Sequence, residues 1–220
     1  MRPALFALAL NLAAASASAA VITQDAEGRY QALLAEAKAN APNVDWASLR
    51  LAYAARPGFQ VFAQSSARRQ MLQAANASNC KDALPSARAV IAEDYVDVDA
   101  HFIAAYCEES SGDASESRLE RDIAVGLVKS IQTGDGLTAE TAFTPITVDE
   151  EYAMMRALGL RVESQALAQQ GGHSYDVLHT LNDKGERGAY WFLIDRVLAA
   201  EAKSLAPGAA SEGAPPSQVP

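Results

Sequence analysis

Three residues near the C-terminal end have side chains that acid–base catalysis or metal binding would use: His173, Asp176 and His179. In one continuous strand the two histidines would share a face and Asp176 would point to the opposite face, because side chains alternate along a strand. A zinc site needs three or four converging ligands, and His173 falls in an expected turn. The spacing therefore predicts no metal site here.

Two runs of acidic residues, one within residues 94–99 and one at residues 149–151, could suggest calcium binding or glycoside hydrolysis. The first run lacks the central glycine and the distal glutamate of an EF-hand loop. In the second run, neighbouring side chains on a helix diverge by about 100°, so they would not face each other as a catalytic pair. We expect both runs to stabilise helix starts, with Asp97 or Asp99 as an N-cap and the second run meeting the helix dipole.

The sequence contains no recognisable nucleophilic or phosphate-binding motif. No G-x-S-x-G is present, no cysteine has a histidine at a supporting spacing, and the Gly134-Asp135-Gly136 turn lacks a Walker or Rossmann context. We therefore expect no catalytic residue, no bound metal and no cofactor.

Cys80 and Cys107 are the two cysteines of the chain. An even number of cysteines in an exported protein favours a disulfide, whereas two small buried apolar side chains would explain them equally well. A helix is expected at 82–93, with Pro85 in its first turn if Asp82 is its N-cap. If this helix and one at 99–111 form an antiparallel hairpin, both cysteines lie toward its open end, offset by about one helical turn. The sequence leaves a disulfide and two separate thiols open, and it lacks the C-x-x-C of a redox catalyst.

Both ends of the chain differ in composition from its middle. Residues 1–19 contain Arg2, an apolar stretch and an A-x-A site, which is the order of a secretory signal peptide cleaved after Ala19. The apolar stretch is too short to span a bilayer, and no cysteine near the cut could carry a lipid. Residues 205–220 are rich in Ala, Pro, Gly and Ser, so we expect a disordered tail.

The net charge and the ends together restrict location and partners. The full chain carries a formal net charge of −9, which repels phosphate backbones and anionic lipid. We expect an exported protein, periplasmic or secreted and not lipid-anchored, with no nucleic-acid partner and no stable membrane insertion. The expected partners are other proteins.

Hydrophobic periodicity divides the remaining chain into two regions. Residues 20–133 show helical spacing interrupted by caps and by Pro and Gly breaks. In residues 134–204 a short strand-like run at 143–147 precedes a helix at about 149–158, and segments with the period of two that is typical of strands follow. We expect a mainly α protein of helical hairpins with a small C-terminal α+β module that holds an antiparallel sheet. The expected strands are 160–169, 175–181 and 189–194.

The stretch DYVDVDAHFIAAYCEESSGD, residues 94–113, resembles the middle of a tetratricopeptide repeat. Stepping back by one repeat length reaches a second, weaker copy, so about two degenerate repeats are expected between residues 65 and 132. Tyr95 stands at the usual place of a proline, and His101 at that of a bulky core aromatic, so we expect His101 to pack between helices. These departures mean that the fold resembles the repeat family more than the binding site does.

A wider resemblance covers about residues 46–197. The stretches SLRLAYAARPGFQVF, GDGLTAETAFTPITVDEEYAMMRALGL and QALAQQGGHSYDVLHTLNDKGERGAYWFLID resemble, in that order, the exported bacterial family called domain of unknown function 4919. The run from 134 to 159 is its most specific part, whereas YWFLID departs from the Tyr/Phe-Asn type of strand in relatives. The resemblance implies an exported protein with a helical front and a sheet-bearing end, and it implies no activity.

These observations favour an exported, non-catalytic interaction or scaffold protein of the bacterial envelope, which binds partners through its helical layer or its sheet edge. The alternative is a periplasmic small-molecule binder or hydrolase whose pocket, between helices and sheet, would bring together Tyr152, Asp176 and His179. In a third interpretation, the C-terminal module is a stabilising cap for the short repeat stack.

Overall fold

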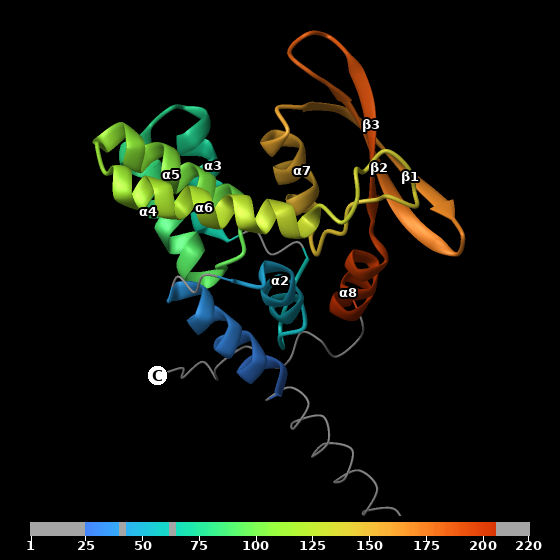
Figure 1. The fold of residues 1–220 in the computed structure, drawn as a ribbon, viewed down its shortest axis with the longest axis horizontal. Coiled ribbons are helices and arrows are strands. Elements are labelled where there is room, and N and C mark those ends of the chain that lie inside the picture. Colours follow the sequence, from blue (N-terminus) through green and yellow to red (C-terminus); the bar gives the residue numbers. More distant parts are fainter. Residues whose placement is uncertain (1–24, 40–42, 62–64, 206–220) are drawn as a thin grey trace, which may run out of the picture. The chain divides into compact units, whose positions relative to one another are not determined.

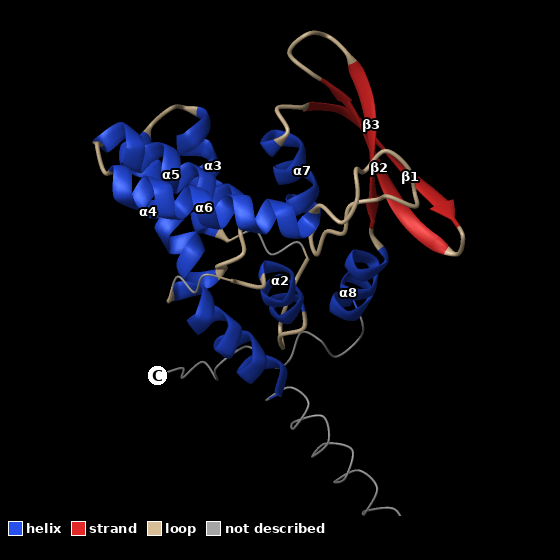
Figure 2. Cartoon of the chain, viewed as in Figure 1, coloured by secondary structure: helices blue, strands red, loops and turns tan. Residues whose placement is uncertain are grey.

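The computed structural model describes residues 25–39, 43–61 and 65–205 (Figure 1). The proposed signal peptide and residues 206–220 lie outside the described residues. The chain forms two compact units, Met1–Phe59 and Gln60–Pro220. Figure 2 shows that the described chain is mainly helical, with one small antiparallel sheet near the C-terminus, and this confirms the expected fold class.

The first unit contains a helical segment at residues 25–38 and helix α2 (Trp46–Ala54). Its interior is aromatic: the Tyr30 ring centroid lies 5.6 Å from that of Tyr53. The Arg56 guanidinium stacks 4.5 Å from the Tyr30 centroid while its Nε donates to Glu27 at 2.8 Å. This arrangement combines a cation–π contact with an ion pair.

Four helices of the second unit form successive hairpins, and α3 also contacts α5. Each helix starts at a side-chain oxygen that accepts the N–H three residues further on, which satisfies one of the donors left unpaired in a first helical turn. Small residues in the core, among them Ala87, Ala100 and Ala104, allow the helices to approach closely around Met71. The helices are α3 (Ser66–Asn76), α4 (Cys80–Glu93), α5 (Val98–Ser111) and α6 (Ala114–Ile131).

The start of α4 differs from the expected one. The helix begins at Cys80 because Asn79, and not Asp82, is its N-cap, and the Asn79 amide also donates to Asp82 Oδ2 at 2.8 Å. Pro85 therefore lies inside the helix and not in its first turn. The earlier start places Cys80 on a helical turn that faces α5.

The C-terminal part of the second unit consists of α7, a three-stranded sheet and α8. In the sheet, Leu167 pairs with Asp176, which in turn pairs with Phe192. Phe143 adds a single parallel bridge to Phe192, where we expected a short strand from residue 143 to 147. The elements are α7 (Val148–Ala157), β1 (Arg161–Gln170), β2 (His173–Leu181), β3 (Arg187–Leu193) and α8 (Asp195–Leu205).

Helix α7 stands between the helical hairpins and the sheet (Figure 1). It packs near α5 and α6 on one side and near β1 on the other. The face of β2 that carries Asp176, Leu178 and Thr180 is buried, whereas His173 and His179 are exposed. We expected His173 in a turn, but it is the first residue of β2.

Candidate binding groove and buried carboxyl pair

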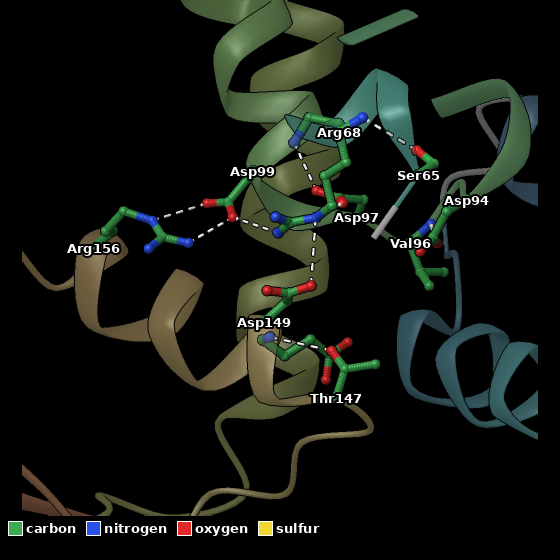
Figure 3. Close-up of polar contacts among 11 residues, drawn as sticks. Ser65, Arg68, Asp94, Val96, Asp97, Asp99, Thr147, Asp149 and Arg156 are labelled. Carbon is green, nitrogen blue, oxygen red and sulfur yellow. Dashed lines mark hydrogen bonds and ion pairs between the residues drawn. The ribbon is translucent and has the colours of Figure 1, made fainter. Parts of the chain in front are cut away.

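An ionic cluster joins α3, the start of α5 and both ends of α7 (Figure 3). The Arg68 guanidinium of α3 donates to Asp97 and to Asp99, each at 2.8 Å, and its Nε lies 3.5 Å from Asp149. From the other end of α7, Arg156 donates hydrogen bonds to Asp99 through Nε and Nη2. Arg68 therefore holds three carboxylates, and Asp99 is shared by two guanidinium groups.

Burial sets the electrostatics of this cluster. It raises the pKa of the Asp97 carboxyl, and the adjacent Arg68 charge offsets that effect only in part. Burial alone would lower the pKa of the Arg68 guanidinium, but the three surrounding carboxylates raise it above its ordinary value. Arg68 consequently stays charged, and its charge compensates two acids, Asp97 and Asp99, that are only 8% and 7% exposed.

A groove of about 470 Å³ lies beside this cluster, between α3, the start of α4, α5 and α7. Its lining is mostly apolar, and the Asp99–Arg156 pair contributes the charged part of the wall. Tyr106 is 60% exposed, which is unusual for an aromatic side chain beside an apolar cavity. Residues that line this groove include Leu72, Phe102, Ile103, Tyr106, Ala153 and Arg156.

A disulfide between Cys80 and Cys107 forms part of the groove wall. The two Cα atoms lie 5.1 Å apart, within the usual range for a bridge, because α4 begins early enough to bring Cys80 beside α5. The bridge closes a segment with a sequence separation of 27 that contains most of the α4–α5 hairpin. It fixes the relation of these two helices at the groove.

The acidic run at the start of α7 has three different environments. Asp149 lies near Arg68, whereas the Glu150 carboxylate accepts the Ile146 N–H at 2.8 Å. Thr147 is the N-cap, and its hydroxyl accepts the Glu150 N–H. Glu151 is 0% exposed and turns toward the sheet. Glu151 lies in the first turn of α7, as expected, but its side chain is turned into the interior.

Glu151 meets Asp176 of β2 in the interior. Among the described residues, the two carboxyl oxygens of Glu151 and Oδ1 of Asp176 have no hydrogen-bond partner. Asp176 Oδ2 accepts from Gln165 Nε2 at 2.6 Å, and the Gln165 Oε1 accepts from the Tyr152 hydroxyl at 3.1 Å. Burial, followed by the negative charge of Asp176, raises the pKa of Glu151 to about 9.

The structure brings together only part of the residue set proposed for a hydrolase pocket. Tyr152 and Asp176 are connected through Gln165, but His179 is exposed on the opposite face of β2. His173 instead pairs with Asp195 at the start of α8.

His101 is fully buried between helices. Its Nδ1 meets Glu120 of α6, its Nε2 lies 2.9 Å from the Tyr95 carbonyl oxygen, and its ring meets the Tyr95 ring edge-on. Across the described ranges, no group of three or more His, Cys, Asp or Glu side chains could hold a metal ion.

The sequence interpretation missed the basic and amide members of these sites: Arg68, Arg156 and Gln165. Arg68 had a usable signal, because it lies three residues before Met71 on the buried stripe of α3. A charged residue on an apolar stripe indicates a buried ion pair.

A family model decides the family of the chain. The model for a domain of unknown function (DUF4919) matches residues 18–203. The chain belongs to the DUF4919 family. Comparisons of this DUF4919 protein with curated proteins and with solved structures give no significant match. In the part of the DUF4919 chain that the structure describes, no helix combines the length and the apolar character needed to cross a membrane.

Proposed function

We propose that this DUF4919 protein is an exported, non-catalytic interaction protein of the bacterial envelope, and that its groove binds an apolar segment of a protein partner. The observation that carries the proposal is the exposed Tyr106 ring beside an apolar groove of about 470 Å³. Tyrosine is among the side chains that most often anchor protein interfaces, and preformed apolar cavities are typical binding sites.

Rigidity of the groove supports a binding role. The disulfide fixes α4 to α5, and the ionic cluster connects α3, α5 and α7, so three sides of the groove are held before a partner arrives. A preformed site avoids part of the ordering cost of association. The tetratricopeptide-like hairpins, of the kind that present concave surfaces to partners, agree with this role.

Export is supported by two independent features. The first residues have the order of a secretory signal peptide, with a cut after Ala19. The Cys80–Cys107 disulfide is the second, because such bonds persist in oxidising compartments such as the periplasm.

A small-molecule binder is the second candidate, favoured by the volume of the groove, since ligand pockets commonly measure about 300–1,000 Å³. A hydrolase has less support. Tyr152 and Asp176 do not line this groove, and His179 points away from both.

Site-specific photo-crosslinking tests the proposal. A photoreactive residue would replace Tyr106 in the groove or, as a matched control, Leu137, which is 56% exposed and does not line the groove. In living cells of the source organism, we expect one reproducible protein adduct at position 106 and none at 137. An additional Ile103→Asp substitution in the groove should remove the adduct. Equal labelling at both positions, or no adduct at 106, would contradict the proposal.

A further inference from the structure

Helix α7 has different chemistry on its two sides. Ala153 and Ala157, one turn apart, line the groove together with Arg156. Glu151 lies on the opposite side of the helix, where it faces Asp176 of the sheet. Whatever holds Glu151 against the sheet therefore also sets the position of one groove wall.

If Glu151 and Asp176 were both ionised, their contact would lack a compensating charge or hydrogen-bond donor. The two side chains are 0% and 3% exposed, and three of their four oxygens have no hydrogen-bond partner within the described ranges. The strongest charges acting on Glu151, those of Asp176 and Glu150, are both negative. Two buried carboxylates without a cation or a donor would strongly destabilise the fold, so the site requires a positively charged or donating species.

A proton fits this site better than a metal ion. A divalent cation takes about six or more oxygen ligands, or keeps several of its waters, whereas this site offers few ligands to a buried ion. One proton placed between Glu151 and Asp176 Oδ1 would supply the missing donor without further ligands. Asp176 Oδ2 is already engaged by Gln165, which leaves Oδ1 as the acceptor.

We propose that Glu151 and Asp176 share a single proton, which Glu151 donates to Oδ1 of Asp176, and that this hydrogen bond holds α7 against the sheet. At high pH the shared proton is lost to hydroxide in the solvent, and two adjacent buried carboxylates remain that repel each other. Helix α7 then loosens from β2. The groove-facing residues Ala153 and Ala157 move with it, and this last step rests on the proposed function.

Carboxyl NMR tests the shared proton without any partner. In protein labelled with ¹³C at glutamate side-chain carboxyls, we expect one resonance that stays in the protonated position at pH 7 and titrates near pH 9. It should be absent in Glu151→Gln and unchanged in Glu93→Gln, a substitution at an exposed glutamate. If every glutamate carboxyl titrates below pH 6, the proposal is wrong.

Unfolding equilibria supply a second readout. Relative to Glu151→Gln, the unfolding equilibrium constant of the wild type should rise between pH 5 and 9 by a factor approaching ten per pH unit. Should Glu151→Gln not fold, Asp176→Asn replaces it in this comparison, because it also removes the repulsion between the two carboxylates. The same rise of the wild-type unfolding constant relative to the variant is expected. Wild-type stability at pH 7 that needs Ca²⁺ or Mg²⁺ and is lost with a chelator would show a cation at the site and overturn the proposal.

The effect on the groove is measured separately. Crosslinking from position 106 should fall severalfold between pH 7 and pH 9 in the wild type and stay constant in Glu151→Gln. A titrating Glu151 with pH-independent crosslinking would remove the link to the groove and leave the shared proton intact. Absence of any crosslink would contradict the proposed function alone.

Discussion

The buried acidic groups on the two sides of α7 are stabilised in different ways. Toward the helices, Arg68 and Arg156 compensate Asp97 and Asp99 at hydrogen-bond distance. Toward the sheet, Glu151 meets Asp176 and its oxygens have no hydrogen-bond partner among the described residues. The first side should therefore depend on keeping its cations, whereas the second should depend on keeping a proton. Substitutions at the two sides are expected to change stability in opposite directions.

Removing the central cation should have the largest effect. Arg68→Met leaves Asp97 and Asp99 buried, and loss of one partner of a buried ion pair typically costs about 3–5 kcal/mol. Urea unfolding at pH 7 would measure the loss, with the exposed Arg118→Met as control. A loss below about 1 kcal/mol would mean that water reaches the cluster and that the two sides of α7 do not differ as described.

The helical side also has a covalent connection, which sharpens the contrast. Replacing both Cys80 and Cys107 by alanine should lower the free energy of unfolding by about 3–4 kcal/mol, given the length of the closed segment. Unfolding of this variant would be compared with that of wild type with its disulfide intact. An unchanged unfolding midpoint would show that packing holds the α4–α5 hairpin without the bridge.

A milder change on the same side separates charge from capping. Asp97 accepts the Ala100 N–H at 2.9 Å and also binds Arg68. Asp97→Asn keeps a capping oxygen and loses the ion pair, so we expect a loss of about 2 kcal/mol in urea unfolding. Asp97→Ala, which removes both interactions, should lose more. Equal losses for the two variants would indicate that the capping oxygen contributes nothing.

On the sheet side the expected sign is reversed. Because the pKa of Glu151 is raised from 4.5 to about 9, its contribution to stability is complete below pH 4.5 and is lost as the pH rises through about 9. Glu151→Gln cannot ionise, and it should be more stable than wild type at pH 6 by on the order of 2 kcal/mol. The advantage should disappear at pH 4. A substitution that destabilises at both pH values would place Glu151 with the cation-compensated acids.

Local signals explain why the helices could be predicted and the sites could not. Hydrophobic spacing and caps such as Ser65 act within a few residues, so the hairpins followed from the sequence. Even so, the sequence offers two possible caps three residues apart, Asn79 and Asp82. Taking Asp82 as the cap misplaced the start of α4. That error also displaced Cys80, which is why the sequence left the disulfide open.

The site contacts depend on tertiary packing that spacing does not encode. Arg68 reaches across 29 residues to Asp97 and 31 to Asp99. Strand alternation does separate Asp176 from His179, but nothing in the periodicity of β2 indicates that Glu151 lies opposite Asp176. An acid at the start of a helix suggests a cap unless the packing of the helix is known.

The smallest effect is expected at Arg156, although its geometry resembles that of Arg68. Arg156 also binds Asp99 through two nitrogens, but its side chain is 52% exposed against 8% for that of Arg68. Exposed pairs contribute about 0–1 kcal/mol, and Asp99 keeps Arg68 as a partner when Arg156 is removed. Arg156→Gln should therefore change urea unfolding by less than about 1 kcal/mol, while crosslinking from position 106 changes because this side chain lines the groove. A loss as large as that of Arg68→Met would show that burial does not distinguish the two arginines.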